Sequence, residues 1–134
     1  MSGLIFFYGT LRPALARGKM RQIVARLERV GLATLPGRLF DLGPYPAALP
    51  EDGASGMIVG EVFRLPRDED LLPQFDRHES FLPDDPARSL YLRLLRTATM
   101  ADGQAASVWV YSYNRDVGQA TLVPNGDYVA WKTG

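Results

Sequence analysis

The chain has 134 residues, of which 46% are hydrophobic and 22% are charged, and these values are typical of a globular protein. We therefore expect residues 1–134 to form a single domain, whose core buries roughly two thirds of the surface of the unfolded chain. The 15 basic and 15 acidic side chains leave no net charge, which argues against a broad electrostatic surface for nucleic acid or an anionic membrane. The absence of cysteine excludes disulfides, thiolate metal sites and a cysteine nucleophile.

The N-terminus carries no targeting signal that the sequence reveals. No basic region precedes its short apolar run, and no run approaches the roughly 20 apolar residues that span a bilayer. We therefore expect a soluble, unprocessed protein, and the lack of cysteine fits a reducing cytoplasm.

The apolar run Leu4–Phe7 has no polar residue to place on a solvated face, so it predicts a strand buried on both sides. Gly9 ends this run, and a glycine there allows positive φ and the close approach of a ligand. Consecutive N–H groups in such a turn can form an anion site, and Arg12 just beyond favours a carboxylate or phosphate. An ordinary exit from a strand into a loop is the alternative interpretation.

A helix is predicted after this loop. Apolar residues recur at the i, i+3, i+4, i+7 spacing of an amphipathic helix from Met20 to Val30, and Gly31 suits its C-cap. The many basic residues between Arg12 and Arg38 then lie mostly on its solvated face.

The remainder of the chain predicts mainly strands. Two short strands at 32–35 and 38–42 flank Pro36-Gly37, and another covers 58–65. A short helix is expected at 68–76, although Pro73 would disturb its interior. Two long strands at 89–99 and 105–113 are joined by a hairpin at Asp102-Gly103. Together these elements predict an α+β fold, a small mixed β-barrel or strongly curved sheet with flanking helices.

Segment 76–81 combines a carboxylate, an imidazole and a hydroxyl. Adjacent residues point in different directions, which argues against a local dyad of His78 and Glu79. Glu79 is interpreted as a functional carboxylate, as a solvated loop carboxylate, or as the partner of Arg77 or Arg93 in an ion pair. With one histidine and no cysteine, only an all-oxygen metal site is conceivable, and no spacing supports one. A Ser-His-Asp hydrolase is also disfavoured, because the serines lack the context of a nucleophile elbow.

Four motifs occur in an order that carries a family resemblance. They are Phe7-Tyr8-Gly9-Thr10-Leu11-Arg12, Asp76-x-x-Glu79, Tyr91-x-Arg93 and Val110-Tyr111-x-Tyr113. From Leu4 to about Trp131 the chain resembles the gamma-glutamylcyclotransferase family, which includes gamma-glutamylamine cyclotransferases and the plant avirulence-induced proteins. The Tyr-Gly-Thr-Leu loop is the most specific of the four motifs.

The resemblance implies a small barrel whose loop holds a γ-glutamyl head group beside one essential glutamate, which Glu79 matches. It implies a transferase or lyase that releases 5-oxoproline and a free amine or amino acid, without metal or cofactor. The residues that it assigns to substrate binding are Tyr8, Gly9, Thr10, Leu11, Tyr91 and Tyr113. We expect residues 38–57 and 84–89 to shape the pocket for the leaving amine.

A different class of function stays open at this point. A non-catalytic module could keep the pocket and bind a small carboxylated metabolite or a protein partner, because a fold does not imply a function. Nucleic-acid binding is the least favoured, and the sequence does not indicate an oligomeric state.

Overall fold

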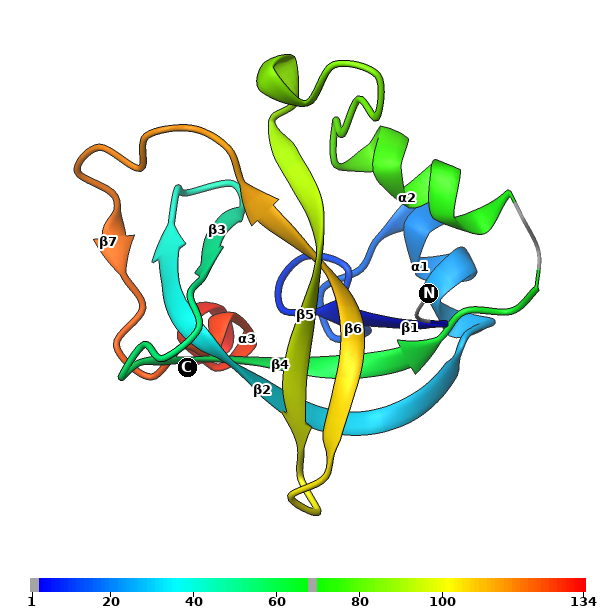
Figure 1. Ribbon diagram of the computed structural model, residues 1–134, viewed down its shortest axis with the longest axis horizontal. Coiled ribbons are helices and arrows are strands. Elements are labelled where there is room, and N and C mark those ends of the chain that lie inside the picture. The colour runs from blue at the N-terminus through cyan, green and yellow to red at the C-terminus, as the bar shows by residue number, and fades with distance from the viewer. Residues whose placement is uncertain (1–2, 68–69) are drawn as a thin grey trace.

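The fold is built around a closed barrel, as Figure 1 shows for this computed structural model, which describes residues 3–67 and 70–134. Within that part of the chain the barrel has five strands in the order β2-β4-β1-β6-β5, and β5 pairs back onto β2 through Thr34 and Thr99. Among the described strands, β1 and β6 form the only parallel pair. The barrel strands are β1 (Leu4–Phe7), β2 (Glu28–Asp41), β4 (Met57–Arg64), β5 (Tyr91–Met100) and β6 (Ala105–Tyr113). The predicted α+β barrel is confirmed.

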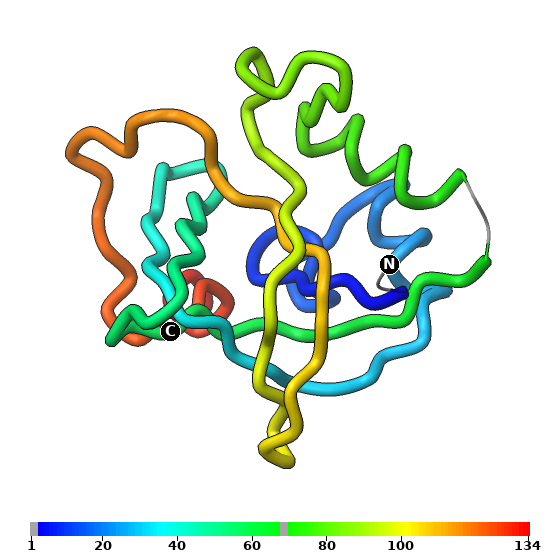
Figure 2. The backbone as a smooth tube through the Cα atoms, in the orientation of Figure 1, coloured from blue at the N-terminus to red at the C-terminus, as the bar shows by residue number. Residues whose placement is uncertain are grey.

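Smaller elements surround the barrel. Two short strands, β3 (Pro46–Pro50) and β7 (Thr121–Leu122), pair with the far end of β2. The helices are α1 (Gly18–Ala25), α2 (Leu71–His78) and α3 (Tyr128–Thr133), with a 3-10 turn η1 at Pro86–Arg88. Figure 2 traces the loop after β1, in blue, through the middle of the molecule between α2 and α3. No helix among the described residues is long and apolar enough to cross a membrane.

The predicted helix from Met20 to Val30 is too long. α1 ends at Ala25, and the chain enters β2 at Glu28, where it pairs with Arg64 of β4. Gly31 is therefore not a helix cap: the register of the β2–β4 ladder shifts between Arg29 and Gly31. Apolar residues that suit a helix face also suit a strand, and the ladder to β4 decides between them.

The two short strands predicted around Pro36-Gly37 are one strand, β2. It pairs with β4 as far as Pro36 and with β3 from Gly37 onward, so this dipeptide marks a change of partner. The hairpin at Asp102-Gly103 is confirmed between β5 and β6.

Helix α2 runs from Leu71 to His78, and the predicted start at residues 68 and 69 lies outside the described residues. Pro73 is the third residue of the helix, where a backbone N–H has no acceptor within the helix. The proline therefore removes no hydrogen bond from α2 and does not interrupt it.

The core has two parts, and β1 belongs to both. Ile5, Phe6 and Phe7 are at most 2% exposed, which confirms the predicted burial of both faces. Phe6 packs inside the barrel, whereas Ile5 and Phe7 pack against α1 and α2. The loop after β1 is thus held between the barrel and these helices.

Candidate active site

The loop after β1 presents backbone N–H groups to a cavity. The N–H of Arg12 donates to the carbonyl of Gly9 at 2.9 Å, which closes a turn around Thr10 and Leu11. Among the described residues, no acceptor is provided for the N–H groups of Gly9, Thr10 and Leu11. All three residues line the cavity, so these donors are available to a ligand.

Gly9 is required by a close contact and not by its φ. It is not among the residues with positive φ, so that part of the expectation is wrong. A Cβ atom at Gly9 would instead overlap Cγ of Pro46. The carbonyl of Pro46 also accepts a hydrogen bond of 2.6 Å from the Tyr91 hydroxyl, which holds this proline in place.

Arg12 supports the loop from behind and does not face a ligand. Its guanidinium is buried and donates to Glu61 at 2.8 Å and to Asp127 at 3.0 Å. Burial acts to raise the pKa of Glu61, but hydrogen bonds from Arg29 and Arg12 outweigh it and lower that pKa. The anion-binding role expected for Arg12 is therefore wrong, because its charge is neutralised by carboxylates that lie far away in the sequence.

Glu79 lies at the end of α2, where the helix closes in a Schellman motif. The N–H of Phe81 donates to the carbonyl of Asp76 at 2.8 Å, and that of Ser80 donates to Arg77 at 3.2 Å. Ser80 adopts the left-handed conformation that this motif needs, with φ +56°. The motif turns the chain sharply at Glu79, the C-cap residue, and places its side chain in the wall of the cavity.

The carboxylate of Glu79 is half-buried and has no hydrogen-bond or ion-pair partner among the described residues. Burial raises its pKa to about 7. The negative end of the dipole of α2 acts in the same direction. Neither ion pair considered from the sequence is present, because Arg93 pairs with Asp76 at 2.8 Å and no contact joins Arg77 to Glu79.

Asp76 fastens α2 to the barrel one turn before Glu79. Its carboxylate accepts from Arg93 and, at 2.7 Å, from the hydroxyl of Tyr111, so it touches both β5 and β6. The guanidinium of Arg93 also lies 4.4 Å from the ring centroid of Trp109. These buried contacts fix the orientation of the helix that carries Glu79.

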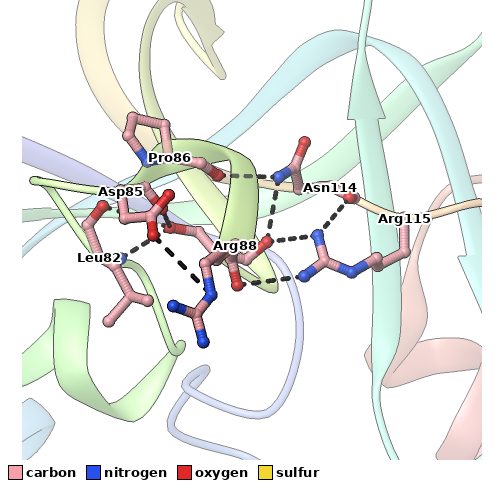
Figure 3. A network of polar contacts seen from close by, with 7 residues as sticks. Leu82, Asp85, Pro86, Arg88, Asn114 and Arg115 are labelled. Atoms are coloured by element: carbon pink, nitrogen blue, oxygen red, sulfur yellow. Dashed lines mark hydrogen bonds and ion pairs between the residues drawn. The ribbon is translucent and has the colours of Figure 1, made fainter.

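The connection from α2 to β5 is fastened too, as Figure 3 shows. Asn114 donates to the carbonyl of Pro86 at 3.1 Å, and Arg115 donates to the carbonyl of Arg88 at 3.1 Å. Glu79 therefore lies between two anchored segments. Residues 84–89 themselves do not line the cavity, whereas Tyr45 and Pro46 from segment 38–57 do.

The cavity has a volume of about 230 Å³ and brings together most of the residues assigned from the sequence. Its wall contains Tyr8, Gly9, Thr10, Leu11, Glu79 and Tyr91. Tyr113 is not in this wall, and its ring packs against that of Tyr91 with centroids 5.4 Å apart. Tyr111 takes the place in the wall instead. Sequence alternation puts Tyr111 and Tyr113 on one face of a strand, so only the tertiary structure separates them.

Three tyrosine hydroxyls of the wall, those of Tyr8, Tyr91 and Tyr111, donate within the protein. Tyr8 donates to the carbonyl of Tyr111 at 2.6 Å, and Tyr111 itself donates to Asp76. Burial raises the pKa of Tyr8, Tyr91 and Tyr111 far above that of a free phenol, so all three are neutral at physiological pH. Their rings shape the cavity. Toward a ligand, their hydroxyl oxygens can act as hydrogen-bond acceptors. The described residues contain no cluster of three or more histidines and carboxylates that could hold a metal ion.

Comparison with known proteins assigns the chain to a family. Residues 5–130 match the family model described as gamma-glutamyl cyclotransferase, AIG2-like. The chain belongs to this family. A curated relative from Halalkalibacterium halodurans, provisionally named a gamma-glutamylcyclotransferase, is 33% identical over 95 residues, which are 71% of this chain and 80% of the relative.

Solved structures share the gamma-glutamyl cyclotransferase-like fold. The E. coli protein ytfP is 27% identical with a TM-score of 0.66, over 96% of this chain and 98% of that one. YkqA from Bacillus subtilis is 24% identical with a TM-score of 0.69; the match covers all of this chain but only 44% of YkqA. The chain thus spans less than half of YkqA and almost all of ytfP.

Within this family fold, the size of the cavity bears on what it can hold. Small-molecule pockets usually have volumes of about 300–1,000 Å³. A volume of about 230 Å³ lies below that range and suits one group the size of an amino acid.

Proposed function

We propose that the protein converts γ-glutamyl amines or γ-glutamyl amino acids into 5-oxoproline and a free amine, with Glu79 as general acid and base. One observation carries this proposal. A carboxylate without a partner, whose pKa burial raises to about 7, shares a small cavity with the unpaired N–H groups of Gly9, Thr10 and Leu11.

The proposed reaction needs no external nucleophile. The α-amino nitrogen of the γ-glutamyl group attacks its own γ-carbonyl carbon, and a new C–N bond closes a five-membered lactam. The original amide C–N bond breaks, and its nitrogen leaves as the free amine. Holding the substrate folded in a small cavity supplies the proximity on which such a cyclisation depends.

Glu79 moves the proton that the reaction must relocate. A free α-amino group has a pKa near 8, so most of it is protonated at neutral pH and cannot attack. A carboxylate whose pKa is about 7 can accept that proton and then deliver it to the departing nitrogen. In becoming the lactam N–H the α-ammonium nitrogen loses two protons, and the departing nitrogen gains two in leaving as an ammonium ion. Glu79 therefore makes this transfer twice and returns to its starting state.

The loop supplies position and polarisation. Its free N–H groups are suited to hold the α-carboxylate of the substrate or to polarise the γ-carbonyl as negative charge develops on its oxygen. The neutral tyrosines of the wall keep water away from the folded substrate and do not compete for the proton. Gly9 allows the loop to pack against Pro46 in this position, because any side chain there would overlap the proline.

Glu79→Gln tests the proposal, because it keeps the shape of the side chain and removes its basicity. We expect the variant to lose formation of 5-oxoproline from γ-glutamyl amino acids by at least about a hundredfold. Glu51→Gln is the matched control, since Glu51 is exposed and does not line the cavity, and it should retain activity. If Glu79→Gln and the unmodified protein form 5-oxoproline at equal rates, Glu79 is not the acid and base. Thermal stabilisation of the unmodified protein by these compounds without any product would instead support the non-catalytic binder.

A further inference from the structure

A second cavity adjoins the first. It has a volume of about 660 Å³ and lies among the loop after β1, α1, the turn at Gly43 and α3. Thr10, Leu11 and His78 line both cavities, so the two share a wall next to Glu79. The first cavity has room for the γ-glutamyl part of a substrate, and the second lies where the departing amine would extend.

The wall of the second cavity carries basic side chains and no acidic ones. Arg17 lines it just before α1, and among the described residues no carboxylate contacts its guanidinium. Lys132 of α3 lines it as well, but its ammonium lies 3.0 Å from the carboxylate of Asp41, which is outside the wall. Desolvation lowers the pKa of His78, so its imidazole is neutral at physiological pH. Arg17 is therefore the one cation in this wall that forms no ion pair with a described carboxylate.

We infer that this cavity is the subsite for the leaving amine and that it selects amines that carry a carboxylate. The inference rests on the proposed function and names its substrate class: γ-glutamyl amino acids and γ-glutamyl peptides, in preference to γ-glutamyl polyamines. A carboxylate on the leaving amine gains from the charge of Arg17, whereas a second ammonium group is repelled by it. Arg17 is exposed, so solvent and salt weaken this attraction and the preference is moderate.

Three substrates whose leaving amines carry a negative charge, no charge and a positive charge test the inference: γ-glutamyl-alanine, γ-glutamyl-alaninamide and γ-glutamyl-putrescine. We expect kcat/KM for 5-oxoproline formation to be about fivefold higher for the alanine compound than for its amide, and lowest for the putrescine compound. Arg17→Gln should bring the ratio of acid to amide close to one through KM, and Arg17→Lys should keep most of it. Arg21→Gln is the matched control, because Arg21 is exposed on the same helix and lines neither cavity.

Binding measurements separate this inference from the proposed reaction. The dissociation constants of γ-glutamyl-alanine and its amide, measured by calorimetry on Glu79→Gln with and without Arg17→Gln, should show the same preference without turnover. Tighter binding of the acid that depends on Arg17 supports the subsite even if no compound yields 5-oxoproline, a result that would refute only the reaction. Equal affinity for acid and amide, or a preference that survives Arg17→Gln, overturns the subsite whether or not product forms.

Discussion

Replacing Glu79 with Gln should stabilise the protein at alkaline pH, although the same change removes the proposed catalytic group. Burial raises the pKa of Glu79 from 4.5 to about 7. One pKa unit corresponds to about 1.4 kcal/mol, so ionising this carboxyl in the folded state costs up to about 3 kcal/mol more than in the unfolded chain. Glutamine has nearly the same shape and never ionises, so it avoids this cost.

The sign of the effect depends on pH. A carboxyl with a raised pKa in the folded state contributes fully to stability below its unfolded value of 4.5. This contribution is lost as the pH rises through the folded value of about 7. The free energy of unfolding of Glu79→Gln should therefore match that of the unmodified protein near pH 4, and exceed it by up to about 3 kcal/mol near pH 8. For a chain of this length, that difference corresponds to roughly 10 °C in Tm.

Urea unfolding followed by circular dichroism, at several pH values between about 4 and 8, measures this difference directly. The other titrating groups are common to both proteins, so their contributions cancel in the comparison. Glu51→Gln should differ little from the unmodified protein throughout, because the side chain of Glu51 is exposed. A gap between Glu79→Gln and the unmodified protein that does not change with pH, or a variant that is less stable near pH 8, would refute the reasoning.

Three further predictions follow from the same geometry. The kcat/KM of the unmodified protein should fall about tenfold per pH unit below about pH 7, because protonated Glu79 cannot accept a proton. A flat pH–rate profile down to about pH 5 would contradict this prediction. Gly9→Ala should lower the free energy of unfolding by about 1–3 kcal/mol and reduce turnover, because the Cβ of alanine overlaps Pro46. Urea unfolding and a 5-oxoproline assay measure the two effects, and unchanged values would count against a close contact. Ser80→Gly should raise the free energy of unfolding by about 0.5–1 kcal/mol, because glycine adopts φ +56° without strain. A variant that is less stable in urea unfolding would show that the serine is not strained.

Short-range patterns in the sequence were sufficient for several elements. The run Leu4–Phe7 is a strand buried on both faces, and Asp102-Gly103 is a hairpin turn, because neighbouring residues alone carry these signals. The border between α1 and β2 was not predictable in this way. Val30 lies at helical spacing from Leu27 and Ile23, and yet pairing with β4 draws this segment into a strand.

The site was only partly predictable. Only the resemblance to a family motif indicates Glu79, because the spacing of Glu79 to its neighbours does not separate a functional carboxylate from a solvated one. Its raised pKa comes from the walls around it, which are built by segments far away in the chain. Tyr111 and Tyr113 were equivalent in the sequence, and the packing of Tyr113 on Tyr91 leaves the place in the wall to Tyr111.

The sequence by itself determined the types of residue on which the site depends: a glycine after a buried strand, an acidic residue near the end of a short helix, and basic residues within the loop and at its end. The tertiary structure alone decided which charges are available. Arg12 is neutralised because the fold brings Glu61 and Asp127 to it, whereas Arg17 keeps its charge because no described carboxylate reaches it. Electrostatic pairing depends on distances of a few ångström between residues that are far apart in the sequence, and only the folded chain sets those distances.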